Sequence, residues 1–199
     1  CKAKSTVQKS FDAALKDHAK MPPGIPIPKF WNPAEKSYLR FRAPIVISAQ
    51  SGVGKSTLAR NIAVNNLMLK IPTVYITNED TMGEAIIGMF TIYTMLNTGR
   101  SFAFQEVEEW LHDTELGGTK HKDNARAVYA FANAMKKYVS IIEAEYWSMS
   151  SVILGIEREE NKFGEPVRCA LFDYIQLAEP EAKDTMKEIR HQMIAKSRM

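Results

Sequence analysis

One stretch, IVISAQSGVGKSTLARNI at 45–62, constrains the fold more than any other part of the chain. Its β-branched run predicts a strand over 44–49, and a helical pattern follows over about 55–69. Between them, residues 49–56 match the phosphate-loop pattern GxxxxGK[ST], with alanine in place of the first glycine. A strand, a glycine loop and a helix in this order predict a site for nucleotide phosphates.

The residue types of this loop each have a chemical reason. Gly52 and Gly54 permit backbone turns that direct successive N–H groups inward. Lys55 would reach the β- and γ-phosphates, and the Ser56 hydroxyl would bind Mg²⁺. The expected phosphate-binding residues are Ser51, Gly52, Val53, Gly54, Lys55, Ser56 and Thr57. The alternative is a chance match in a Gly/Ser loop, expected in roughly one or two per cent of chains this long.

Beyond this loop the pattern alternates between strands and helices. We expect strands at 44–49, 73–78, 138–144 and 167–177, and helices at 55–69, 81–96, 104–115, 124–137, 148–160 and from about 183. Thr81 and Glu84 are spaced as a capping box at the start of one helix. Near-continuous apolar strands separated by helices predict an α/β fold, with a mostly parallel sheet covered by helices on both faces.

The first 43 residues have a different character. Val7, Phe11 and Leu15 recur every four positions and predict a separate helix over 1–20. The segment MPPGIPIPKF at 21–30 has four prolines and indicates a linker. We therefore divide the chain into a linker helix (1–20), a proline-rich segment (21–43) and an ATPase domain (44–199). The missing initiator Met and the helical pattern at the end predict a fragment of a longer protein, incomplete at its C-terminus.

Composition excludes several classes of protein. The 199 residues are 45% hydrophobic and 25% charged, which is typical of a globular protein, and the net charge of +3 does not itself indicate nucleic-acid binding. Cys1 and Cys169 form no CxxC motif and the four histidines are scattered, so we expect free thiols and no metal-ligand cluster. No apolar run reaches the roughly 18 residues of a membrane span. We expect an intracellular, cytoplasmic protein.

Two acids follow predicted strands. In an open parallel sheet the ligand lies beyond the carboxyl ends of the strands. Asp173 ends the run CALF and continues into an apolar segment, where a carboxylate is costly unless it is paired or metal-bound. Glu79 follows VYITN on another strand. We expect Asp173 to hold Mg²⁺ with Ser56, and Glu79 to activate water; the alternative for either acid is a turn residue or a helix cap.

These segments resemble the DnaB-type replicative helicases, a RecA-like family that includes phage primase-helicases. LFDYIQL at 171–177 is similar to the family's Walker B segment, and YITNEDTMGEAIIGMF to its second strand, which carries the catalytic glutamate. The resemblance gives Glu79 that role and places Gln176 near the nucleotide, although an amide packed at a strand end explains Gln176 equally well. MPPGIP, YVSIIEA and MSSVILGI also have counterparts, so the likeness covers about 22–199.

The resemblance implies a RecA-like ATPase that hydrolyses Mg-ATP at the subunit interfaces of a hexameric ring and translocates on single-stranded DNA during DNA replication. Primase or other replisome proteins are further expected partners, and the stripe of Val7, Phe11 and Leu15 would dock on a neighbouring subunit. An ordinary connector helix is the alternative for that stripe. Ala49, the polar Asn78–Asp80 segment and the divergent region 100–137 depart from the family pattern, and the family's DNA-contacting loops and arginine finger have no counterpart here.

Three other interpretations stay open at this point. A recombinase or clock-type ATPase would share the nucleotide chemistry without unwinding DNA. A small-molecule or nucleoside kinase would use 97–137 as a substrate lid, although that region offers only Arg100 and Arg126 to clamp phosphates. A loader or adaptor would use bound ATP only as a structural switch.

Overall fold

The computed structural model of the chain describes residues 52–143 and 148–173, together with positions 13, 16, 24–26, 38–39, 45–47 and 50. The chain divides into two compact units, residues 1–43 and 44–199.

The first unit contains a short antiparallel pair. Strand β1 (Ile25–Pro26) pairs with β2 (Tyr38–Leu39), and Ala13 and Lys16 are helical. The predicted stripe of Val7, Phe11 and Leu15 lies outside the described residues, so its docking role stays a prediction.

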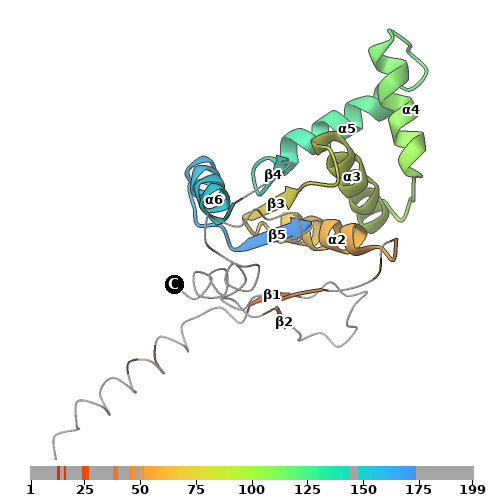
Figure 1. Cartoon of the computed structure of the whole chain (residues 1–199). Helices are drawn as coiled ribbons and strands as arrows, with labels where there is room; N and C mark the ends of the chain where they lie inside the picture. Colours follow the sequence, from red (N-terminus) through yellow and green to blue (C-terminus); the bar gives the residue numbers. More distant parts are fainter. Residues whose placement is uncertain are drawn as a thin grey trace, which may run out of the picture. The chain divides into compact units, whose positions relative to one another are not determined.

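The described part of the second unit is built on three parallel strands in the order β4–β3–β5 (Figure 1). Strand β3 (Thr73–Thr77) is central, with β4 (Val139–Glu143) and β5 (Cys169–Asp173) on either side. Thr77 is in register with both Glu143 and Asp173. All three strands therefore end at the same edge of the sheet, as parallel strands joined by helices should.

The described residues of this unit also form five helices: α2 (Lys55–Met68), α3 (Met82–Thr98), α4 (Phe104–Glu115), α5 (Lys122–Met135) and α6 (Met149–Phe163). Their positions confirm the predicted helices to within a few residues. Helix α3 begins with the predicted capping box of Thr81 and Glu84 and ends at Gly99, whose φ of 71° is left-handed. Across the part of the chain that the structure describes, no helix is long and apolar enough to cross a membrane.

Alternate side chains of β3 face two separate apolar clusters. Tyr75 packs with residues of α2, α3 and α5 on one face, whereas Val74 and Ile76 pack with Val152 of α6 on the other (Figure 1). This alternation follows from the two-residue period of a strand. Helices therefore cover both faces, and the predicted α/β class with a parallel sheet is confirmed. Leu171 and Asp173 of β5 share the α2 face with Tyr75 by the same alternation.

The strand predicted at 44–49 is wrong for the residues that are described there. Ile45, Val46 and Ile47 have no regular secondary structure, and their exposed fractions are 52%, 78% and 43%. A β-branched run becomes a strand only when a neighbouring backbone completes its ladder, because strand propensity depends strongly on context. Among the described residues, β5 pairs with β3 alone and no strand pairs with 45–47.

Candidate active site

The predicted phosphate loop has the backbone geometry that its glycines permit. Gly52 and Gly54 have φ angles of 78° and 91°, both in the left-handed region that side chains other than glycine disfavour. Gly54 begins α2, and its carbonyl accepts a hydrogen bond from the Leu58 N–H at 2.9 Å. The chain therefore turns sharply into the helix at this loop.

The N-terminus of α2 differs from those of α3 and α6. Capping boxes close the other two helices, whereas no described side chain caps α2 and its first turn carries no acid. Uncapped first-turn N–H groups and the positive end of the helix dipole favour a bound anion. This terminus is therefore suited to a phosphate group.

The loop is closed by its own lysine. The Lys55 ammonium donates to the backbone carbonyl of Gln50 at 2.9 Å, and the Lys55 and Ser56 residues are half-buried. Val53 and Thr57 are exposed, and Ser51 lies outside the described residues. Lys55 and Ser56 thus start α2 beside the loop backbone, where both types of group reach phosphate oxygens in loops of this pattern.

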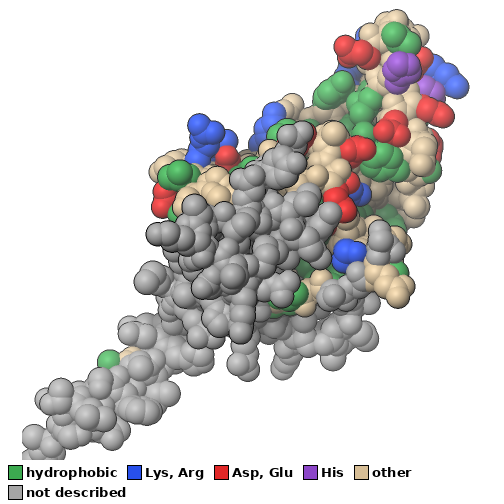
Figure 2. Space-filling view, viewed as in Figure 1, with side chains coloured by type: hydrophobic (Ala, Val, Ile, Leu, Met, Phe, Trp, Pro, Cys, Tyr) green, Lys and Arg blue, Asp and Glu red, His purple; other side chains and the backbone are tan. Residues whose placement is uncertain are grey.

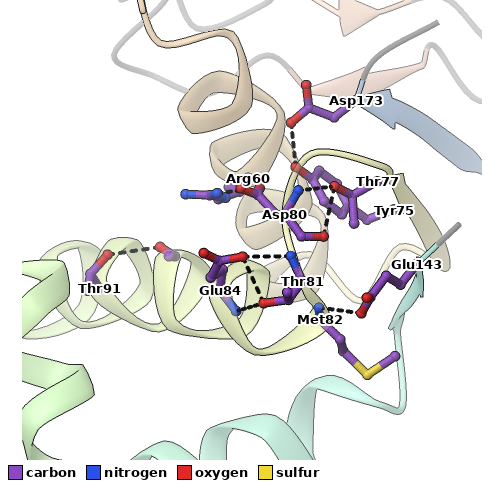
Figure 3. A network of polar contacts seen from close by, with 11 residues as sticks. Arg60, Tyr75, Thr77, Asp80, Thr81, Met82, Glu84, Thr91, Glu143 and Asp173 are labelled. Atoms are coloured by element: carbon purple, nitrogen blue, oxygen red, sulfur yellow. Dashed lines mark hydrogen bonds and ion pairs between the residues drawn. The ribbon is translucent and has the colours of Figure 1, made fainter. Parts of the chain in front are cut away.

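Asp173 is a buried carboxylate at the end of β5. Only 4% of Asp173 is exposed, and its Oδ2 accepts a hydrogen bond from the hydroxyl of the fully buried Tyr75 at 2.8 Å (Figure 3). Burial raises the pKa of Tyr75, and the negative charge of Asp173 raises it further, so the phenol stays a neutral donor. Within the described part of the chain, no Lys or Arg forms an ion pair with Asp173.

This surrounding suits a bound cation. A buried charge is costly unless it is paired or metal-bound, and a neutral phenol neutralises none of the charge of Asp173. The carboxylate of Asp173 and the hydroxyl of Ser56 are hard oxygen donors of the kind that Mg²⁺ prefers, with phosphate oxygens completing its coordination. No group of three His, Cys, Asp or Glu side chains in the described residues could hold a metal without such help.

Glu79 lies in a short loop between β3 and α3, and it is exposed. The N–H of Asn78 donates to the Asp173 carbonyl at 3.1 Å, so the loop starts against the end of β5. Thr81, and not Glu79, caps α3: its side chain accepts from the Glu84 N–H, and its own N–H donates to the Glu84 carboxylate at 2.7 Å. The capping alternative for Glu79 is therefore not what the structure has.

Several contacts outside the predicted set hold this loop in place. The Oγ1 of Thr77 accepts from the Asp80 N–H at 3.0 Å, and the Met82 N–H donates to Glu143 Oε2 at 2.8 Å (Figure 3). An ion pair joins Asp80 to Arg60 of α2. Together these contacts bring the loop of Glu79 to the edge where β3, β4 and β5 end.

Sequence reasoning missed the polar residues that support the site. Tyr75 belongs to a strand predicted only as apolar, although a phenol two positions before a strand end is able to reach the neighbouring strand's last residue. Arg60 is about one and a half helical turns beyond Lys55, and only the tertiary structure shows that it reaches Asp80. Glu143 is the acid that ends β4, in register with Thr77. Gln176, expected near the nucleotide, lies outside the described residues.

The fold resembles solved helicase ATPase domains. It superposes on a separately solved ATPase domain with a TM-score of 0.64 and 17% identity, covering 98% of this chain and 66% of that one. It superposes on a DnaB-like replicative helicase, solved in a study of its interactions with primase, with a TM-score of 0.61 and 15% identity, covering 98% of this chain and 46% of that one. The chain thus spans less than two thirds of either relative's length. No protein-family model and no curated protein matches the sequence. The chain has the RecA-like fold of DnaB-like helicase ATPase domains.

Proposed function

We propose that this chain is the ATPase motor domain of a DnaB-type replicative DNA helicase, which hydrolyses Mg-ATP and uses that energy to move along single-stranded DNA. The main support is one arrangement: an uncapped helix behind a left-handed glycine loop, a buried Asp173 without a described cation partner, and Glu79 in a loop bonded to the Asp173 backbone. The fold likeness to helicase ATPase domains supports the same assignment.

Each residue has a role in this proposal. The backbone of 51–57 and the Lys55 ammonium bind the phosphates, with Lys55 exchanging its bond to the Gln50 carbonyl for phosphate oxygens. Ser56 and Asp173 hold Mg²⁺, which neutralises charge that develops between the β- and γ-phosphates. Glu79 orients the attacking water and accepts its proton, and Gln176 contributes near the nucleotide.

The partners follow from the same proposal. DnaB-type motors work as hexameric rings with nucleotide at the subunit interfaces, so we propose self-association, with the 1–20 helix docking on a neighbouring subunit. Single-stranded DNA is the proposed track, and a primase is a proposed partner because one solved relative was studied with primase. The cytoplasm is the proposed place of action.

A kinase is less well supported by the 97–137 region. Helix α4 carries five acids and neither Lys nor Arg, which disfavours the approach of a phosphorylated substrate (Figure 2). These acids are Glu106, Glu108, Glu109, Asp113 and Glu115. Arg126 of α5 pairs with Asp123 at 3.5 Å within its own helix. This region therefore lacks the cluster of arginines that a phosphate-clamping lid needs.

The test is to measure ATP turnover by the full-length protein with and without single-stranded DNA. We expect release of inorganic phosphate that increases when DNA is added, and unwinding of a forked duplex. A rate that DNA never affects, or a product in which a small acceptor carries the phosphoryl group, would replace this assignment with the switch or kinase interpretation.

A further inference from the structure

Arg60 crosses from one helix to the loop that follows β3. It lies on α2, and its guanidinium pairs with Asp80 directly after Glu79; the side chains of Arg60 and Asp80 are only 14% and 18% exposed (Figure 3). Such an ion pair lies beneath the surface, where solvent screens it less than an exposed pair. Burial alone would lower the pKa of Arg60, but the hydrogen bond and charge of Asp80, with smaller contributions from Tyr75, raise it above its ordinary value.

The path of this side chain depends on a glycine in α3. A Cβ at Gly88 would lie 2.6 Å from Arg60 Nη1 and 2.8 Å from its Cδ, both closer than real Cβ contacts allow. Gly88 is buried and lies in the interior of α3, where glycine weakens a helix. The space above Gly88 is thus occupied by Arg60, and only a residue without a side chain leaves room for it.

The loop that Arg60 reaches is held at neighbouring positions. The Asp80 N–H donates to Thr77 Oγ1, so both the backbone and the carboxylate of Asp80 are fixed. Glu79 lies between Asn78, whose N–H bonds to the Asp173 carbonyl, and this fixed Asp80. The backbone that carries Glu79 therefore has little freedom while the ion pair is intact.

Arg60 also shares a rigid element with the phosphate loop. It is five residues after Lys55 on α2, about 7.5 Å farther along the helix axis. A displacement of the start of α2 is therefore transmitted directly to Asp80 by the guanidinium. The helix that begins at the phosphate loop and the loop that carries the acid move as one body.

We propose that Arg60 is a positioning residue that acts through Asp80: it couples α2 to the Glu79 loop and holds the carboxylate of Glu79 where it meets the attacking water. This inference rests on the proposed ATPase function. A positioning role predicts a loss in turnover with little change in nucleotide binding, because Arg60 contacts the Glu79 loop and not the phosphate-binding residues. A role in folding alone predicts fewer active sites, each with normal turnover.

The first experiment compares ATP hydrolysis by the full-length wild type with the Arg60→Ala, Asp80→Asn and double variants, with rates normalised to sites that bind nucleotide. Misplacement of a catalytic group by about 1 Å can cost 10²-fold, so each single change should lower kcat by about 10- to 100-fold while the KM for ATP changes little. The double variant should be no slower than the slower single variant, since both remove one interaction. Arg126→Ala is the matched control, because its pair with Asp123 is exposed on α5, and we expect it to retain wild-type kcat.

Two further variants test the geometry. Gly88→Ala keeps both charges and strengthens the helix propensity of α3, yet it displaces Arg60, so it should lower kcat in the same way. Gly83→Ala is the control in the same helix, because its Cβ would meet only Thr81 Oγ1 at an ordinary 3.9 Å. Arg60→Lys keeps the positive charge but loses the planar fork, so its kcat should lie between those of wild type and Arg60→Ala.

The outcomes separate the two proposals. If the wild type does not hydrolyse ATP, the proposed function and this inference both fail. If the wild type hydrolyses ATP but Arg60→Ala retains its kcat per binding site, only the positioning role is overturned. A double variant whose kcat loss equals the product of the two single losses, or a Gly88→Ala variant as fast as Gly83→Ala, also contradicts action through Asp80.

Discussion

Replacing Tyr75 with Phe isolates the hydrogen bond that supports Asp173. The change removes one oxygen from a fully buried side chain, so it leaves almost no cavity, but it takes a donor at 2.8 Å from a carboxylate that is only 4% exposed. A hydrogen bond to a charged group contributes about 1.5–3 kcal/mol, and an unsatisfied buried acceptor adds to the loss. We expect Tyr75→Phe to lower the free energy of unfolding by about 1.5–3 kcal/mol near neutral pH.

The pH dependence of this loss has a defined sign. The folded protein holds the pKa of Tyr75 above its ordinary value of about 10. The stabilisation is therefore fully present below about pH 10 and is lost as pH rises above it, because the unfolded tyrosine ionises first. Wild type should lose about 1.4 kcal/mol per pH unit from this group in that range. Tyr75→Phe lacks this loss, so the difference between the two proteins should shrink above about pH 10.

Urea unfolding at equilibrium, followed by circular dichroism in buffers free of Mg²⁺, measures both quantities. Tyr129→Phe is the matched control, because that residue is 51% exposed and its hydroxyl is at the surface; we expect a change below about 0.5 kcal/mol. A loss for Tyr75→Phe no larger than that of the control, or a loss that grows between about pH 9 and 11, would refute the argument.

Two other substitutions test the site more broadly. Lys55→Ala should abolish ATP binding or hydrolysis and leave the circular dichroism spectrum unchanged, since the Lys55 bond to the Gln50 carbonyl lies in an exposed part of the loop; turnover at the wild-type rate would contradict the phosphate-loop assignment. In a Cys1→Ser background, Cys169 should react with a thiol reagent at about pH 8 about 10³-fold more slowly in the folded than in the urea-unfolded protein, because burial raises its pKa to about 12 and the thiolate is the reactive form; equal rates would show that the thiol is not enclosed.

Local patterns carried most of the fold. The helical period set α2 to α6, and the capping box of Thr81 and Glu84 and the glycine at 99 marked the ends of α3. Such signals are readable because the interacting groups lie within one or two turns of each other in sequence. The left-handed Gly52 and Gly54 were predictable for the same reason, since the loop pattern dictates their backbone.

Contacts between distant segments were not predictable. Tyr75 and Asp173 are 98 residues apart, and nothing in the run TVYIT distinguishes a phenol that packs from one that donates to a carboxylate. The ion pair of Arg60 and Asp80 depends on Gly88, whose role appears only when α2 and α3 are packed together. The strand expected at 44–49 failed for the same reason, because a strand requires a neighbour that local sequence does not specify.

Glu79 carries the central claim that this site transfers a phosphoryl group to water, and its isosteric replacement tests that claim most directly. Glu79→Gln keeps the size of the side chain and a hydrogen bond but removes the base, and losing such a group typically lowers the rate about 10²–10⁴-fold. The full-length Glu79→Gln protein should bind ATP with wild-type affinity in a titration with Mg²⁺, still self-associate and still bind single-stranded DNA, while phosphate release falls by that factor. Hydrolysis at the wild-type rate with ATP bound normally would contradict the account.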